Sequence, residues 1–460
     1  MSSAPHPLES PDAPVPPRIP PRVRYRAAWV LPIVAPPIRS GWVDVQDGRV
    51  RAVGAPGEEP DARVDDEIDL GRVALLPGLV NAHTHLELSW LWGRVPPAVS
   101  FTAWVGHLIA LRRAEGDKPD AMTLVLTECE EAGTALVGDI ANTLASLPAL
   151  AHSRLRAVIF HELLGFNVRD ARQAIQAARA VQQQAWTQLL ELAARAAAPA
   201  SADGGGVGVG VGAGERSIDL RPADAASRLL VRTVPHAPYS VSPSLIREIA
   251  NDAEARGEVC SIHLGESPEE VQLLRDGRGP WREILQRVAE WDPDWRAPGC
   301  GPADYLDALG VLGPRLLVIH GVQLTDAELH LLARRKSTLV TCPRSNVWVG
   351  VGDPPIARFY ASGVRVAIGT DSLASNSDLN IFNELAAMHH LAPGVPAGRL
   401  LASATRVGAE ALGVDDMGAI RPGDRARLIT VDLPITPLDD IETYLVEGVD
   451  PGQIAWPIPE

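Results

Sequence analysis

The sequence has few cysteines, almost no lysine and no long apolar run. Its four cysteines are far apart and form no CxxC pair, which argues against a disulfide scaffold or a zinc ribbon and fits a reducing cytoplasm. Lys118 and Lys336 are the only lysines, so arginine carries nearly all of the positive charge. No apolar stretch approaches the length of a membrane span, which argues against a transmembrane protein.

The charge balance is acidic. A net charge of -15 argues against nucleic acid or an anionic membrane as the main partner. Residues 1–21 are rich in proline and lack the basic start and apolar centre of a signal peptide, so we expect a disordered tail and a cytoplasmic protein. The remaining length suits one large α/β barrel and a smaller domain.

The two ends of the ordered chain both resemble short β-strands joined by turns. Residues 42–53 alternate apolar and polar side chains on either side of a Gln-Asp-Gly turn, which predicts a hairpin. A second β-rich stretch, 426–431, follows a Pro-Gly-Asp turn near the other end. We therefore expect residues 22–72 and 415–455 to form one composite β-sandwich.

Eight apolar, β-rich runs recur between these ends, separated by helical stretches. Continuously apolar strands that alternate with helices indicate a parallel sheet, and eight repeats predict a (β/α)8 TIM-type barrel over residues 73–414. The runs are Val73–Ala82, Ala135–Asp139, Ala157–His161, Leu229–Val234, Val259–His263, Leu316–His320, Thr338–Cys342 and Val364–Thr370.

Two segments interrupt this repeat. Residues 201–214 are nearly all glycine, valine and alanine, which predicts a flexible inserted loop. The tryptophan-rich segment 281–300 could close over the site as a lid or add packing, and we favour packing.

Helix caps show where the strands end. Ser242, Ser267 and Thr325 each precede a helical stretch, the first two with proline at the next position. Residues between a strand and its cap belong to the C-terminal face, where barrel active sites lie.

Histidines gather at these predicted strand ends. Any one of them could be a hydrogen-bonded core residue. Together, however, they would converge on one face of one barrel, which favours a functional site. They are His83, His85, His236, His263 and His320.

The sequence predicts a metal site within this set. His83 and His85 are two positions apart, so both side chains would project to the same side of an extended strand. His263 and Asp371 would complete the ligands of one divalent ion. Zinc accepts such ligands and lowers the pKa of its bound water, generating hydroxide. Iron or manganese would accept them too.

A carboxylate follows one of these ligands. Glu266 lies three residues after His263, where a proton shuttle to the substrate is needed. An acid could also be favoured there by the helix N-terminus, but Glu269 and Glu270 already serve that purpose. We predict a catalytic role for Glu266, and we expect His320 to orient the hydroxide.

Five ordered motifs resemble the amidohydrolase superfamily, in its deaminase and chlorohydrolase branch. This resemblance implies a (β/α)8 barrel that hydrolyses an aminated or halogenated carbon of a small heterocyclic substrate. The resemblance is compatible with a homodimer. The motifs are Pro77–His85, His236–Ser240, His263–Glu266, Cys342–Asn346 and Gly369–Ser372.

Many members of that superfamily hold two metals bridged by a carbamylated lysine on the fourth strand. Here that strand ends in Pro235 and His236, and neither lysine is near it. The resemblance therefore implies a single metal ion. It further implies that Asp371 takes a proton from the water, that His320 holds the nucleophile and that Glu266 protonates the ring nitrogen.

A substrate type is implied by a narrower resemblance to aminodeoxyfutalosine deaminases of menaquinone biosynthesis, carried by residues 85–89, 101–104 and 112–113. It implies substrate contacts from Glu87, His236 and Arg344, although Arg344 could equally form an ion pair that braces its loop. A guanine, pterin, cytosine or triazine deaminase or chlorohydrolase remains an alternative. So does a metal-binding barrel without catalysis, although such a protein would be expected to lose Glu266 or Asp371.

Overall fold

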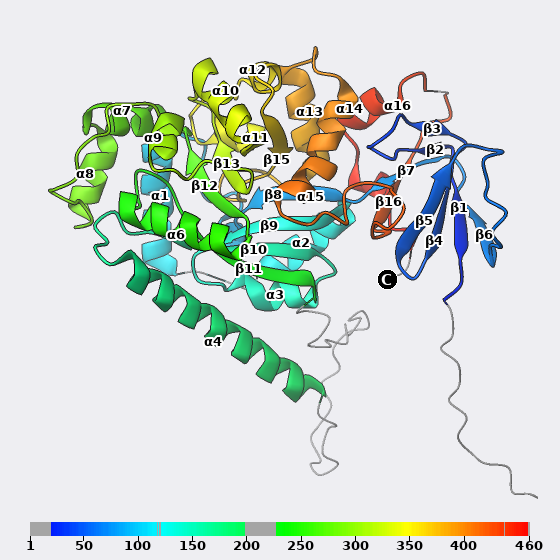
Figure 1. Cartoon of the computed structure of the whole chain (residues 1–460), viewed down its shortest axis with the longest axis horizontal. Helices are drawn as coiled ribbons and strands as arrows, with labels where there is room; N and C mark the ends of the chain where they lie inside the picture. Colours follow the sequence, from blue (N-terminus) through cyan, green and yellow to red (C-terminus); the bar gives the residue numbers. More distant parts are fainter. Residues whose placement is uncertain (1–19, 117, 119–120, 198–226, 437, 459–460) are drawn as a thin grey trace, which may run out of the picture.

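The structure, a computed structural model, describes residues 20–116, 118, 121–197, 227–436 and 438–458 (Figure 1). Most of the predicted N-terminal tail and the whole glycine-rich insertion at 201–214 lie outside these described residues. Parallel strands and most helices form one body, and sheets built from the two chain ends lie beside it at the right of Figure 1. Within the described part, no helix is long and apolar enough to cross a bilayer.

Two sheets contain the strands from the chain ends. One has the order β5(Arg49–Gly54)-β4(Trp42–Gln46)-β1(Val23–Arg26)-β6(Asp66–Asp69), and the other β17(Ile454–Ala455)-β16(Leu428–Asp432)-β7(Val73–Pro77)-β2(Trp29–Val30)-β3(Ile38–Arg39). β16 pairs antiparallel with β7, which joins the two ends of the chain. One apolar cluster, including Val43, Leu75 and Leu428, contains residues of both sheets. The composite β-sandwich and its boundaries stay a prediction.

The run 73–82 is two strands, so its prediction as one strand was wrong. β7 ends at Pro77, and β8(Leu79–Thr84) begins after Gly78. A Cβ atom at Gly78 would lie 2.6 Å from that of Ala135, so the chain needs glycine for this close approach. β7 joins the sheet of the chain ends, and β8 joins the parallel strands.

Eight parallel strands form two four-stranded sheets, which confirms the predicted parallel α/β arrangement. The first has the order β11(Leu229–Pro235)-β10(Arg156–Leu163)-β9(Thr134–Ala141)-β8, and the second β12(Cys260–Leu264)-β13(Leu316–His320)-β14(Thr338–Thr341)-β15(Arg365–Ile368). Backbone bonds link the sheet edges: Thr370 N–H donates to His83 O over 3.0 Å, and His263 N–H donates to His236 O over 2.9 Å. These bonds hold the C-terminal end of β8 beside that of β15, and the end of β11 beside that of β12.

The helices between these strands begin at the predicted caps. Ser242 Oγ accepts from Leu245 N–H, and Thr325 forms a capping box with Glu328. The helices are α1(Phe101–Glu115), α2(Ala121–Glu131), α3(Ser146–His152), α4(Ala171–Ala197), α6(Pro243–Arg256), α7(Pro268–Asp276), α8(Pro280–Arg287), α9(Pro302–Ala308), α10(Asp326–Arg335), α11(Pro343–Trp348), α12(Ile356–Ala361), α13(Ile381–Leu391), α14(Ala397–Ser403), α15(Arg406–Ala411) and α16(Ile441–Val446). Short 3-10 turns lie at η1(Leu86–Leu91) and η2(Pro451–Gln453).

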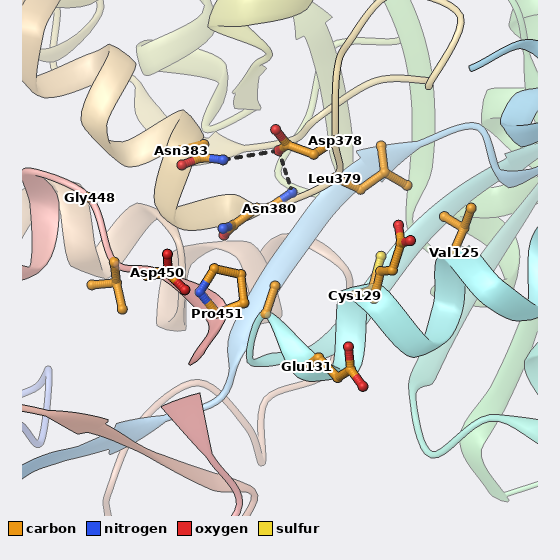
Figure 2. Close-up of a pocket in the computed structure, with 13 residues that line it drawn as sticks. Val125, Cys129, Glu131, Asp378, Leu379, Asn380, Asn383, Gly448, Asp450 and Pro451 are labelled. Atoms are coloured by element: carbon orange, nitrogen blue, oxygen red, sulfur yellow. Dashed lines mark hydrogen bonds between the residues drawn. The ribbon is translucent and has the colours of Figure 1, made fainter. Parts of the chain in front are cut away.

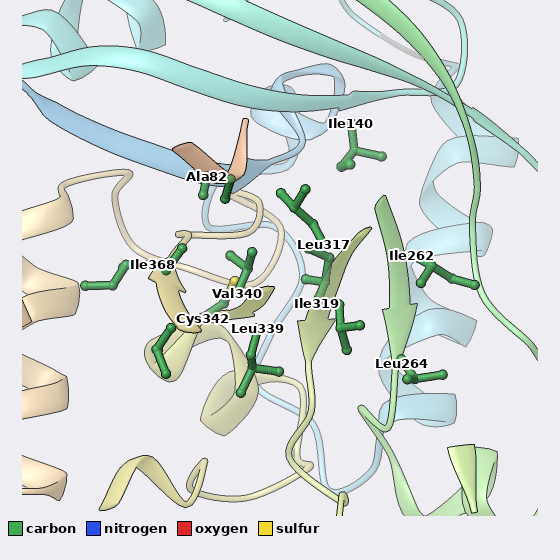
Figure 3. Close-up of a cluster of buried hydrophobic side chains, with 14 of the residues drawn as sticks. Ala82, Ile140, Ile262, Leu264, Leu317, Ile319, Leu339, Val340, Cys342 and Ile368 are labelled. Carbon is green, nitrogen blue, oxygen red and sulfur yellow. The ribbon is translucent and has the colours of Figure 1, made fainter. Parts of the chain in front are cut away.

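The parallel strands are apolar along their length (Figure 3). Ile262 and Leu264 of β12, with Leu317 and Ile319 of β13, are almost completely buried. Because side chains on both faces of these strands are buried, the sequence reads as continuous apolar runs instead of alternating ones. Most of the charged and imidazole groups of interest therefore lie at the strand ends.

Candidate active site

Five of the predicted site residues come together at the C-terminal strand ends. The ring centroid of His83 lies 5.0 Å from that of His85, 4.9 Å from that of His263 and 5.6 Å from that of His320. Asp371 Oδ1 lies 3.5 Å from His85 Nε2 and 4.0 Å from His83 Nε2. Residues separated by almost 300 positions thus form one cluster.

The cluster has the properties of a divalent metal site. His83 is completely buried, and neither of its ring nitrogens has a hydrogen-bond partner among the described residues. Burial lowers the pKa of His83 well below its usual value, and neighbouring imidazoles add to this effect, so the ring is neutral with a free lone pair. Burial opposes ionisation of Asp371, but His85 and His320 outweigh it and lower the pKa of this carboxyl. The neutral imidazole of His83 beside an ionised carboxylate suits zinc.

Two hydroxyls fix the orientation of Asp371. Ser345 Oγ donates to Asp371 Oδ2 over 2.6 Å, and Ser375 Oγ donates to the same oxygen over 3.2 Å. Oδ1 is left on the side of the histidines. Asp371 also has a left-handed backbone, with φ of 59°, a conformation that is uncommon for residues other than glycine and that concentrates at functional sites.

Gly369 allows the strand end that carries Asp371 to approach β8. A Cβ atom there would lie 2.7 Å from both the Cβ and the carbonyl oxygen of His83. A side chain at position 369 would therefore displace a proposed metal ligand.

Glu266 lies beside the cluster in a buried position. Its Oε1 is 3.5 Å from His320 Nε2, and its side chain is 3% exposed. Burial raises the pKa of Glu266 well above its usual range, which favours the protonated carboxyl. Glu270 accepts the backbone N–H groups of Gly265 and Glu266, which satisfies this turn without the Glu266 side chain. Glu266 therefore has the protonation state of a general acid.

His320 is held by a side-chain amide. Asn346 Nδ2 donates to His320 Nδ1 over 3.0 Å. Burial lowers the pKa of His320 to about 3, so the ring is neutral and its proton lies on Nε2, toward Glu266. His320 can therefore donate a hydrogen bond at the base of the site.

A cavity of about 450 Å³ opens above these groups. Five predicted residues line it together with His236, whose Nδ1 is hydrogen-bonded to Ser240 Oγ. Apolar side chains of α1 and α8 form much of the wall: Phe101, Trp104, Val105, Leu108, Trp281, Ile284 and Leu285. The site combines a polar base with apolar walls, as small-molecule sites usually do.

Glu87 does not belong to the described lining of this cavity. Its carboxylate accepts backbone N–H groups of Asn142, Thr143 and Ala145 over 2.9 to 3.2 Å, and the Thr143 hydroxyl over 2.8 Å. Glu87 holds the loop that follows β9. Its predicted contact with substrate is not supported by this geometry.

Arg344 also lies outside the described cavity lining. Its guanidinium forms a two-pronged pair with Asp378 over 2.7 and 2.8 Å. Asp378 in turn lines a second cavity, of about 540 Å³, between α2, the start of α13 and residues 448–451 (Figure 2). Arg344 therefore forms an ion pair, which was the alternative to a substrate contact in the sequence interpretation.

Sequence reasoning did not place Glu162, Arg112 or Trp281 among the site residues, although all three line the cavity. Glu162 lies one residue beyond the predicted end of its strand, and Arg112 lies at the C-terminal end of α1. Trp281 is buried and stacks on Tyr239 with ring centroids 4.0 Å apart. The alternation along the third strand could have indicated Glu162. The positions of Arg112 and Trp281 in the cavity wall depend on how α1 and α8 pack.

Two other tryptophans of the tryptophan-rich segment do not belong to the described cavity lining. Trp291 and Trp295 contact Phe166, with ring centroids 5.5 and 5.4 Å apart. Packing therefore describes these two tryptophans, whereas Trp281 also forms cavity wall.

Comparison with known proteins matches this chain to one enzyme family and to several deaminases. The sequence profile of the amidohydrolase family matches residues 74–454. A 5-methylthioadenosine/S-adenosylhomocysteine deaminase from Moorella thermoacetica is 28% identical, over 92% of this chain and 90% of that protein. A 5'-deoxyadenosine deaminase from Methanothermobacter thermautotrophicus is 29% identical, over 86% and 81%. The solved structure of a zinc-bound adenosine deaminase from Xanthomonas campestris is 26% identical, with a TM-score of 0.71 over 95% and 91%.

Proposed function

The chain belongs to the amidohydrolase family, and we propose that it is a hydrolase that replaces the amino group of an adenine-type nucleoside with oxygen. One observation carries this proposal. A buried, protonated Glu266 lies beside His320 and a histidine–aspartate cluster at the base of a cavity. An acid and a metal-ligand set in one pocket are the groups that hydrolytic deamination requires.

His83, His85, His263 and Asp371 would hold one divalent ion, which we propose is zinc. The unsatisfied nitrogens of His83 and the ionised state of Asp371 support this fit. When bound, the metal would supply a water of lowered pKa. Strand β11 ends at Pro235, followed by His236, so no lysine is at hand there to bridge a second ion.

Three side chains would transfer protons and orient the attacking water. Asp371 accepts a proton from the attacking water, and His320 orients that water through its Nε2 proton. Glu266 gives its proton to the ring nitrogen next to the carbon under attack, which makes that carbon electrophilic. A tetrahedral carbon forms, its amino group takes up a proton, and the C–N bond breaks. Water and amine are thereby converted to a ring carbonyl and ammonia.

The substrate class rests on the relatives and on the cavity. Curated relatives that cover most of this chain are named as deaminases of adenosine derivatives that differ at the 5' position. The apolar walls from α1 and α8 suit a base and a 5' substituent. Aminodeoxyfutalosine is the best single substrate that we propose. An aminofutalosine deaminase from Helicobacter pylori shares the fold with a TM-score of 0.73 at 22% identity.

A substrate panel tests this function. We expect the zinc-loaded protein to release ammonia from adenine nucleosides and to shift the product mass by one unit. Guanine, pterin, cytosine and triazine compounds should give much lower kcat/KM values. Turnover of one of these heterocycles in place of every adenine nucleoside would contradict the proposal.

Arg112 is expected to select substrates that carry a carboxylate. It lines the cavity from α1, and its guanidinium suits a carboxylate on the 5' substituent. We expect Arg112→Gln to raise KM by about 10- to 100-fold for S-adenosylhomocysteine or aminodeoxyfutalosine, because charged hydrogen bonds contribute about 1.5–3 kcal/mol. KM for 5-methylthioadenosine should change little.

The neighbouring Arg113 provides a matched control. It is exposed and does not belong to the described cavity lining. Arg113→Gln should leave the KM values of both substrate types unchanged in steady-state assays. Equal KM changes for acidic and neutral substrates in Arg112→Gln would show that Arg112 does not read the carboxylate.

We also propose that the eight parallel strands close into a (β/α)8 barrel over residues 73–414, with a sandwich built from 22–72 and 415–455. The backbone bonds from Thr370 to His83 and from His263 to His236 support closure at both sheet junctions. The apolar cluster shared by the two terminal sheets supports the sandwich.

A further inference from the structure

Glu162 is a carboxylate inside the active-site cavity without an assigned role. It lies near the end of β10, is 4% exposed and lines the cavity. Its neighbours are Asn142, His236 and His263. A buried carboxylate needs hydrogen-bond donors or positive charge to remain ionised.

The two oxygens of Glu162 have different surroundings. Oε2 accepts the side-chain amide of Asn142 over 2.9 Å. Oε1 lies 3.3 Å from His263 Nδ1, but that nitrogen is only 3.0 Å from the backbone oxygen of His236, to which it is hydrogen-bonded. His263 is nevertheless the partner of Oε1 among the described residues. A carboxylate oxygen has two lone pairs, so Oε1 can accept a further hydrogen bond.

Donor groups lie against both oxygens of the carboxylate: the side-chain amide of Asn142 at Oε2 and the ring of His263 at Oε1. An ionised carboxylate only accepts hydrogen bonds. A ligand group next to Oε1 must then be a donor.

A second metal is the competing occupant. One ligand atom each of Glu162, His236 and His263 lies within 4.8 Å of the others. However, His236 Nδ1 is bonded to Ser240, and His263 Nδ1 to the backbone oxygen of His236. His263 would also have to bridge two ions. These bonds favour a substrate donor over a second metal.

We propose that Glu162 is a substrate-binding residue whose Oε1 accepts a hydrogen bond from a sugar hydroxyl of the nucleoside. This inference rests on the proposed function. His236 faces the same part of the cavity, so the two side chains form one recognition site between β10 and β11. Substrates without the matching donor leave a buried charge unpaired and are rejected.

The test compares analogues that differ by one donor. For the zinc-loaded wild type, kcat/KM for adenosine should exceed that for the 2'-deoxy or the 3'-deoxy analogue by about 10- to 100-fold. In Glu162→Gln the corresponding ratio should fall to about 1, while zinc content by elemental analysis stays at one per chain.

Glu328 provides a matched control, because it is a similarly buried carboxylate, 3% exposed, that caps α10 away from the cavity. Glu328→Gln should keep the wild-type ratio. An unchanged ratio in Glu162→Gln would overturn the proposal. An equal loss of kcat/KM for all analogues in Glu162→Gln would also overturn the proposal, because Glu162 would then act only by positioning His263. A second zinc that disappears in Glu162→Gln would assign the residue to a metal site.

Product binding separates this proposal from the proposed function. Inosine should bind more tightly than its matching deoxy analogue by calorimetry, and Glu162→Gln should remove that difference. A wild type that deaminates nucleosides without discrimination overturns the role of Glu162 alone. A protein that neither turns over nor binds any nucleoside overturns both.

Discussion

Glu266→Gln should lower kcat by about 10²- to 10⁴-fold while the protein keeps its metal, because general acid–base help of this kind has that magnitude. The glutamine retains the shape of the side chain but cannot give up a proton. Its position 3.5 Å from His320 should be preserved, so zinc content and Tm should stay near wild-type values. Steady-state kinetics and elemental analysis measure both quantities.

The pH profile gives an independent reading of the same residue. Burial raises the pKa of Glu266, so the protonated, active form persists at neutral pH and is lost as pH rises through that raised pKa. The wild-type rate should therefore fall on the alkaline side, and the residual rate of Glu266→Gln should lack this fall.

Glu269 is a suitable control for this substitution. It is a partly buried acid at the start of α7 and does not belong to the described cavity lining. Glu269→Gln should keep near-normal turnover and the alkaline fall. Near-full turnover in Glu266→Gln would remove Glu266 from the mechanism.

Removal of the metal should abolish turnover and lower the free energy of unfolding. Both ring nitrogens of buried His83 lack a hydrogen-bond partner among the described residues, and a bound ion would pair with one of them. Zinc at about 1,000 times its Kd stabilises a folded protein by about 4 kcal/mol. Dialysis against a chelator should therefore lower Tm and stop ammonia release, and added zinc should restore both.

Metal binding should also release a proton. Burial opposes a charge on His263, but Glu162 outweighs it and raises the pKa of the metal-free residue to about 9. At pH 7 this imidazole is protonated and must become neutral to bind the ion, so zinc affinity should rise with pH up to about 9. Calorimetry in buffers of different ionisation enthalpy counts the protons released.

Two histidine variants test whether the metal acts at the proposed site. His83→Ala should show neither a zinc-dependent rise in Tm nor turnover. Replacement of the exposed His152, at the end of α3, should change neither. A wild type that keeps its Tm and its activity after complete loss of metal would contradict the proposed site.

The sequence alone determined the parallel α/β arrangement and the helix starts. Apolar runs and caps such as Ser242 and Thr325 depend on residues only a few positions apart, so local patterns predict them. The alternation of His83 and His85 along a strand is equally local. The break at Gly78 was missed, because it reflects a close approach to Ala135 that no local pattern contains.

Only the tertiary structure decided which polar groups face the substrate. Glu87 binds the loop at 142–145, and Arg344 pairs with Asp378, so partners distant in the chain occupy both side chains. Arg112 and Glu162 instead line the cavity because of how α1 packs and where β10 ends. A side chain's role depends on its neighbours in space, which a single sequence does not specify.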